Sequence, residues 1–198
     1  MSQFLRQALG RWYVCLLLFL GPAIIFPVFV QPAADKIVQH GAGAPKILDE
    51  YVMTWTAQDA RQLYQAIGPD GRAAIRHFYL HLDFWFPVFS LMLFYISLLS
   101  LAFPEQSPLA PLNLLPIPMW LLDEAENLNH FTMAGSYPDW SEFSLTFGPW
   151  FTFWKWALIF AIPLLAVLGF LLKAISSPRK VTGKGPGQRR HGGKGQLS

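Results

Sequence analysis

The sequence predicts an all-α polytopic membrane protein with four transmembrane helices and a short interfacial amphipathic helix. Of its 198 residues, 53% are hydrophobic and only 14% are charged, a balance too apolar for an ordinary soluble domain. Apolar runs at residues 12–30, 84–103 and 150–172 each approach or exceed the roughly 20 residues needed to span the hydrocarbon. Tryptophan rings favour the headgroup zone, and those near the run ends are predicted to be interfacial anchors. The eight are Trp12, Trp55, Trp85, Trp120, Trp140, Trp150, Trp154 and Trp156.

The first apolar run, residues 12–30, is preceded by Arg6 and Arg11 and followed by Pro32-Ala-Ala. This arrangement also fits a cleaved signal peptide, which we keep as the alternative. The run is longer than the roughly 7–15 residues usual for the apolar part of a signal peptide, so a retained crossing is favoured. Cys15, the single cysteine, lies inside it, which excludes an intrachain disulfide.

The outer loop, residues 31–82, contains a predicted amphipathic helix over about residues 57–67. Thr56 and Asp59 have the spacing of a capping box, with Asp in place of Glu or Gln, and apolar residues follow at helical spacing. The Gly-Pro-Asp-Gly sequence at residues 68–71 predicts a turn. A second helix should then start near Gly71 and continue without a break into the second crossing, residues 84–103.

The third crossing, residues 109–130, combines a short apolar run with a polar helix face. Its apolar part ends at Leu122, too early to span a bilayer, so a crossing here places the polar residues at membrane depth. Spacings of three, four and seven put four polar side chains on one face of the helix. They are Asp123, Glu126, Asn127 and His130.

Four crossings place the N-terminus, the loop at residues 104–108 and the C-terminal tail on one side of the membrane. That side carries nine Lys and Arg residues, against five in the outer loop. Both termini are therefore predicted to be cytoplasmic. Residues 1–175 form the predicted transmembrane domain, and residues 176–198 form a basic tail too polar to order itself. The tail is read as a topology signal, with attraction to anionic lipid as the alternative; nucleic acid is not expected as a partner.

The topology brings the ionisable residues of three crossings to one depth, under the outer face. Asp83 lies at the outer end of the second crossing, Asp123 and Glu126 lie in the last turns of the third, and Lys155 lies early in the fourth. Lys155 is expected to pair with Asp123, Glu126 or Asp83, because an uncompensated charge in hydrocarbon is costly. Glu124 points about 100° away from Asp123 and should contribute less.

The favoured hypothesis is a pocket that binds the head of a lipid-like small molecule, with membrane lipids as the surrounding partners and no cofactor. Its ligand-binding residues are Asp83, Asp123, Glu126, Asn127 and Lys155. One alternative is an intramembrane acid/base enzyme, an isomerase, cyclase or hydrolase. In that reading Asp123 or Glu126 is the catalytic group and His130 a proton shuttle to the outer surface. The sequence contains no nucleophile elbow or phosphate loop that supports such chemistry.

Three further readings use the same residues differently. The polar network could fix helix packing or dock a partner subunit in a homo- or hetero-oligomer. A proton relay is disfavoured, because the polar residues occupy one leaflet only. A metal site is the third: His77 and His81 are four residues apart, and His130 could approach from the third helix, but the prediction is that no metal binds.

Three stretches carry a family resemblance: Pro69-Asp-Gly-Arg leading to Leu82-Asp-Phe-Trp-Phe-Pro, then Asp123-Glu-Ala-Glu-Asn, then Lys155-Trp. Over residues 54–172 the chain resembles a group of small bacterial four-helix integral membrane proteins of uncharacterised function. This resemblance implies a multi-pass protein of the bacterial inner membrane. The layout is also similar to sterol-isomerase-type and sigma-2-receptor-type membrane proteins, which bind sterol-like ligands against intramembrane carboxylates. Their histidine and glutamate pattern is not matched here, so no catalytic role is carried over.

Overall fold

The computed structural model describes residues 1–41, 46–84 and 87–176, and the regular structure in these ranges is entirely helical. The predicted disorder of the basic tail falls almost wholly on residues outside these ranges. The α-helices are α1 (Ser2–Leu9), α2 (Trp12–Ile25), α3 (Gln31–Gln39), α4 (Ala57–Ala66), α5 (Gly68–His77), α6 (Pro87–Ala102), α7 (Pro116–Ser136) and α8 (Glu142–Ser176). Short π-helical segments η1 (Phe26–Val30) and η3 (Phe78–Asp83) and 3₁₀ segments η2 (Leu48–Glu50) and η4 (Ala110–Leu114) connect them.

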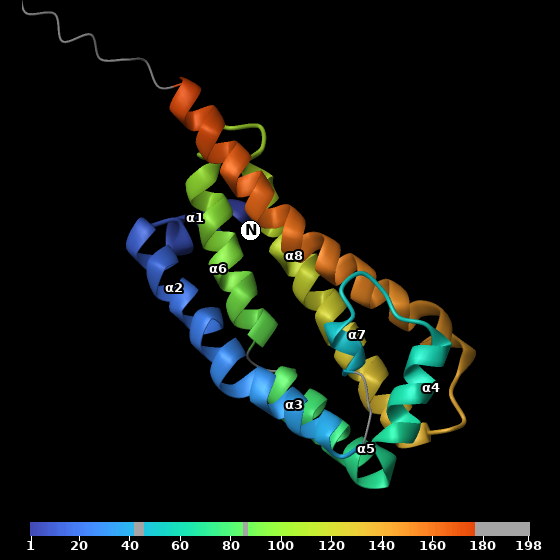
Figure 1. The fold of residues 1–198 in the computed structure, drawn as a ribbon. Coiled ribbons are helices and arrows are strands. Elements are labelled where there is room, and N and C mark those ends of the chain that lie inside the picture. Colours follow the sequence, from blue (N-terminus) through green and yellow to red (C-terminus); the bar gives the residue numbers. More distant parts are fainter. Residues whose placement is uncertain (42–45, 85–86, 177–198) are drawn as a thin grey trace, which may run out of the picture.

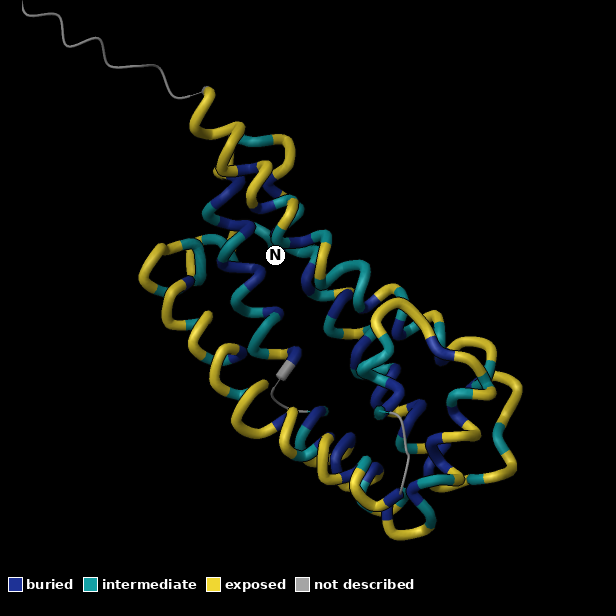
Figure 2. The backbone as a smooth tube through the Cα atoms, in the orientation of Figure 1, coloured by how far each residue is buried: buried dark blue, intermediate teal, exposed yellow. Residues whose placement is uncertain are grey.

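Three helices are long and apolar enough to cross a membrane: Trp12–Gln39, Gly68–Ala102 and Glu142–Ile175. They contain the predicted crossings at residues 12–30 and 150–172, and all but the last residue of the crossing at 84–103. Much of the first and last of these helices is exposed (Figure 2), and the exposed residues include large apolar ones such as Leu17 and Leu164. A soluble monomer rarely exposes apolar surface of this extent, so these faces suit a lipid environment.

The third predicted crossing, residues 109–130, differs from the observed helix. The α-helix begins at Pro116 and ends at Ser136, and residues 110–114 form a 3₁₀ segment instead. Proline is accommodated in a first helical turn because its missing N–H has no partner there anyway. With 21 residues α7 is about 31 Å long, which is enough to cross a membrane. It is less apolar than the three helices above because it carries Asp123, Glu124 and Glu126.

The chain termini and loops separate into two ends of the helical bundle (Figure 1). The N-terminus, the loop at residues 104–108 and the C-terminal end of α8 lie at one end, and α4 and α5 lie at the other. Arg6 ties α1 to the first end, because its guanidinium donates to the carbonyl oxygens of Ser100 (2.8 Å), Ala110 (2.7 Å) and Phe103. The Ser100 carbonyl lies in the last turn of α6, where helical carbonyls lack an intrahelical partner.

Helix α4 confirms the predicted amphipathic helix and its capping box. The Thr56 hydroxyl accepts a hydrogen bond from the Asp59 amide (3.2 Å), and the Asp59 carboxylate accepts one from the Thr56 amide (2.7 Å). Its apolar face is buried against the protein through residues such as Leu63 and Tyr64. The Tyr64 hydroxyl donates to the His130 carbonyl at 3.3 Å, so α4 caps the bundle directly over α7.

The turn between α4 and α5 is shorter than predicted. Helix α5 starts at Gly68 rather than near Gly71, because Gly68 alone reverses the chain with φ of +64°. A left-handed backbone conformation costs glycine little, since it has no Cβ. Pro69 then occupies the first helical turn, where proline is well tolerated.

Two apolar clusters make up the core, and a polar region separates them along α7. One cluster surrounds α4 and α5 and includes Tyr64 and Met133; the other lies between α6 and α8 and includes Met119 and Leu99. The predicted anchoring role is wrong for Trp55, which is 2% exposed and packs inside the protein. Trp85 lies outside the described residues.

Candidate functional site

The middle of α7 carries the predicted polar face, and the structure buries it completely. Asp123, Glu126, Asn127 and His130 are each at most 1% exposed. They fall between Met119 and Met133, which belong to the two apolar clusters. The helical period inferred from the sequence is therefore confirmed, and this face points into the protein rather than toward lipid.

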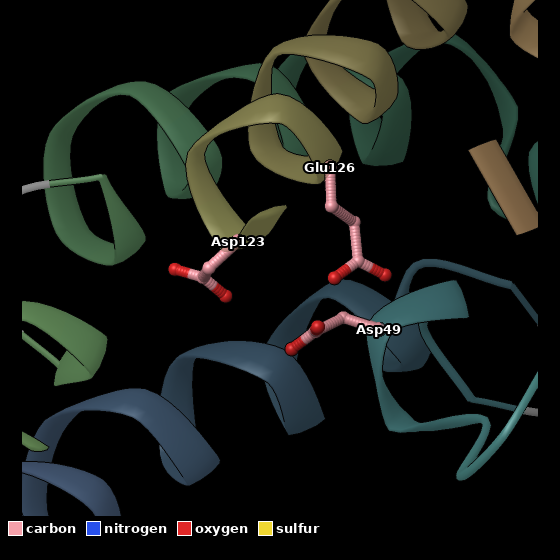
Figure 3. Close-up of side chains that lie close together, drawn as sticks. All are labelled: Asp49, Asp123 and Glu126. Atoms are coloured by element: carbon pink, nitrogen blue, oxygen red, sulfur yellow. The ribbon is translucent and has the colours of Figure 1, made fainter. Parts of the chain in front are cut away.

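Among the described residues, Lys155 of α8 is the cation at the centre of this face. Its ammonium lies 2.5 Å from a Glu126 carboxylate oxygen and 3.4 Å from an Asp123 oxygen, which confirms the predicted ion pairs with these two residues. It also contacts the carboxylate of Asp49 directly. Figure 3 shows the carboxylates of Asp49, Asp123 and Glu126 pointing toward one shared space.

Asp49 is a member of the site that the sequence analysis missed. It lies on η2, directly after the buried residues Ile47 and Leu48, and its backbone carbonyl accepts a hydrogen bond from the Trp156 indole at 3.1 Å. Burial raises the pKa of the Asp49 carboxyl, and the Lys155 ammonium opposes that rise. The apolar residues Ile47 and Leu48 indicate that the chain is buried just before Asp49. A loop residue has no helical period, however, so the sequence does not show that it contacts α7.

Glu126 is the most heavily coordinated carboxylate. Besides Lys155 it accepts a hydrogen bond from the Thr152 hydroxyl, and its oxygen lies 3.4 Å from Nε2 of His130. The Trp55 indole donates to the same hydroxyl at 3.0 Å. Helix α8 approaches α7 this closely because Gly148, one turn before Thr152, has no side chain: an added Cβ would lie 2.3 Å from Nδ2 of Asn129.

His130 is buried between aromatic rings. Its ring centroid lies 5.0 Å from that of Tyr79 and 5.7 Å from that of Trp55. Its Nδ1 atom has no hydrogen-bond partner among the described residues. The imidazole itself does not reach the surface, so any proton path outward would have to pass through its neighbours.

Asp83 joins the site from η3. The chain continues from α5 with a π-helical turn over residues 78–83, rather than as the continuous α-helix predicted, and both Tyr79 and Asp83 face the interior. Such π turns occur frequently at functional sites. Asp83 is 3% exposed and interacts electrostatically with Asp123, but it forms no ion pair with Lys155 within the 4 Å that defines one.

Among the described residues, the carboxylates of the site outnumber its ammonium groups. One ammonium faces the carboxylates of Asp49, Asp83, Asp123 and Glu126. Asn127 donates weakly to Asp123 at 3.4 Å. The buried oxygens Oδ2 of Asp83 and Oδ1 of Asn127 have no hydrogen-bond partner in the part of the chain that the structure describes. Leaving such a buried group unsatisfied costs about 1–3 kcal/mol.

Glu124 points away from the site, as its position on the helix predicts. It accepts a hydrogen bond from the Trp120 indole at 2.7 Å and, with Phe84 and Phe89, lines a separate pocket of about 210 Å³. It is therefore a natural control residue for the site.

The alternative metal site of His77, His81 and His130 is not assembled. His77 and His81 are exposed and stack on each other with ring centroids 4.4 Å apart, whereas His130 is buried beside Glu126. Within residues 1–41, 46–84 and 87–176, the set of three metal-ligating groups that meet within 4.8 Å is Asp49, Asp123 and Glu126. Lys155 contacts all three of these, so its ammonium already neutralises them in part.

Comparisons of the chain with protein-family models, curated proteins and solved structures give no match.

Proposed function

We propose that the chain is an integral membrane protein with four crossings, both termini on the cytoplasmic side, and α7 as the innermost helix. In support, α7 is long enough to cross and runs between the two ends of the bundle (Figure 1). Its acidic face is turned toward α8 and the loop that carries Asp49. An amphipathic helix of this kind is stable in a membrane only when neighbouring helices and loops cover its charges.

We further propose that the polar cluster of Asp49, Asp83, Asp123, Glu126, Asn127 and Lys155 binds the head of a lipid-like small molecule. The observation that carries this proposal is the surplus of buried carboxylates over ammonium groups among the described residues. A complementary head group would bring hydroxyl or amine donors, and a positive charge would fit the excess of carboxylates. The apolar remainder of such a molecule would lie among the surrounding helices.

A purely structural role fits the cluster less well. Replacing buried ion pairs by apolar residues is often neutral or stabilising, so packing alone does not require four carboxylates around one lysine. Interhelical hydrogen bonds in membranes average only about 0.6 kcal/mol. Unpaired acceptors such as Asp83 Oδ2 add cost without strengthening the packing.

Acid/base chemistry on the bound molecule is the second candidate. It is favoured by the approach of the Glu126 carboxylate to the His130 imidazole, at 3.4 Å, with the second ring nitrogen unpartnered among the described residues. A carboxylate and an imidazole in contact can share one proton, which a general acid or base requires. Turnover would be recognised by a co-purified molecule whose mass, retention time or fragment spectrum differs between wild type and Glu126→Gln.

The test is to purify the protein in mild detergent and to identify co-extracted lipids by mass spectrometry. Asp83→Asn is the most informative variant, because Asp83 forms none of the Lys155 ion pairs; Asp123→Asn is the companion. We expect a specific molecule in the wild type whose occupancy falls about ten- to hundredfold in both variants, the equivalent of one charge-assisted hydrogen bond.

The matched control is Glu124→Gln, which removes a carboxyl from the same helix outside the cluster. It should retain the molecule at the wild-type level. Identical lipid content in wild type, Asp83→Asn and Asp123→Asn would refute the proposed binding role. Reduced thermal stability with unchanged lipid content would favour the packing role instead.

A further inference from the structure

A second polar site, separate from the acidic cluster around Lys155, lies in a groove between α3 and the α5–η3 segment. The groove has a volume of about 440 Å³. Its basic side chains are Lys36 of α3, His40 directly after α3, His77 of α5 and His81 of η3. Ile37 and Phe78 are buried and form an apolar floor. We call these six residues the histidine groove.

The histidine groove has the charge of an anion site. Among the residues that line it, none is acidic, whereas one ammonium and three imidazoles are present. All four basic residues are exposed, so they are accessible to a ligand. This composition is the reverse of that of the acidic cluster around Lys155.

The two stacked histidines, His77 and His81, both line the groove. Nδ1 of His81 lies 3.2 Å from the His77 carbonyl oxygen, which can only accept, so Nδ1 carries the proton. The Nε2 atom of His81 is then left to contact a ligand. A phosphate accepts a hydrogen bond from Nε2 when the ring is an imidazolium, which carries a proton on both nitrogens.

The position of the groove indicates what kind of anion fits. It lies on two of the helices able to cross a membrane, Trp12–Gln39 and Gly68–Ala102, and close to the end of the first. Large apolar side chains are exposed in the neighbouring segments, including Phe29 on η1 and Leu80 on η3. A phospholipid whose phosphate lies in the groove could therefore extend its acyl chains along the helices.

We propose that the histidine groove binds the phosphate of an anionic phospholipid, independently of the acidic cluster. Basic side chains in a pocket between membrane helices attract anionic headgroups and form hydrogen bonds with them. The apolar floor formed by Ile37 and Phe78 would contact the glycerol and upper acyl carbons. The lipid would hold the first two membrane helices together at this level.

The experiment measures lipid binding to the full chain in detergent by native mass spectrometry. The probes are phosphatidylglycerol and phosphatidylcholine with identical acyl chains. We expect wild type to retain phosphatidylglycerol preferentially. The double variant Lys36→Gln/His81→Gln should lose affinity for it by at least about fivefold, the contribution of the Lys36 charge alone, with phosphatidylcholine unchanged. The single variant His81→Lys should retain the preference for phosphatidylglycerol, because it places a cation at the same position.

The control is Arg61→Gln, which removes an exposed cation from α4 at the same end of the bundle. It should leave the phosphatidylglycerol preference intact. Equal losses in the control and the double variant would overturn the proposal, because they would indicate general surface charge. Full displacement of the lipid by millimolar inorganic phosphate would also overturn the proposal. So would a double variant that loses zinc binding while its lipid binding is unchanged.

Discussion

Lys155→Met is expected to lower the free energy of unfolding by about 3–5 kcal/mol, the range for a buried ion pair broken from one side. Lys155 is 2% exposed and contacts three carboxylates, which would all lose their counter-charge at once. Met fills a similar volume, so the effect reports charge rather than a cavity. Thermal or denaturant unfolding of the purified protein in detergent measures it.

The control for this prediction removes two of the negative charges that the lysine would otherwise neutralise. Adding Asp49→Asn and Glu126→Gln to Lys155→Met should recover much of the lost stability, because neutral amides leave fewer uncompensated charges. If Lys155→Met alone unfolds at the wild-type midpoint, the carboxylates do not depend on the ammonium and the electrostatic account of the cluster is wrong.

Tyr64→Ala is expected to destabilise the protein by about 3–5 kcal/mol, as truncation of buried aromatic side chains does. Tyr64 is completely buried, packs against Trp140 with ring centroids 5.6 Å apart, and bonds to the His130 carbonyl. Unfolding of the purified variant in detergent measures the loss. A helix resting on lipid instead of on protein would tolerate the same truncation.

The exposed neighbour Gln62 supplies the matched control on the same helix. Gln62→Ala should change the free energy of unfolding by less than about 0.5 kcal/mol, as exposed substitutions usually do. Equal stabilities of Tyr64→Ala and Gln62→Ala would mean that α4 is not docked on the bundle.

Features fixed by local physics could be predicted from the sequence. The Thr56–Asp59 capping box, the helix over residues 57–66 and the shared face of Asp123 and Glu126 all depend on contacts within one or two helical turns. The ion pairs of Lys155 with that face were predictable for another reason. Few charges lie in apolar segments, and charges in such surroundings pair with one another.

Features that depend on distant contacts were not predictable. Asp49 meets Lys155 across 106 positions of sequence, and a loop carries no period that indicates which helix it will contact. Trp55 was assigned to the membrane interface from its residue type, yet its indole is buried against Thr152. The π turn that ends at Asp83 likewise follows from packing between helices, because no residue in it breaks an α-helix.

The central claim is that α7 crosses the membrane and thereby buries its acidic face inside the bundle. Cysteine accessibility tests this directly, with Gln106→Cys and Asp139→Cys made singly in a Cys15→Ala background. Both positions are exposed, and they flank α7 at opposite ends. The account predicts that a membrane-impermeant thiol reagent labels residue 106 from the cytoplasmic side only and residue 139 from the other side only. Labelling of both positions from the same side would contradict it.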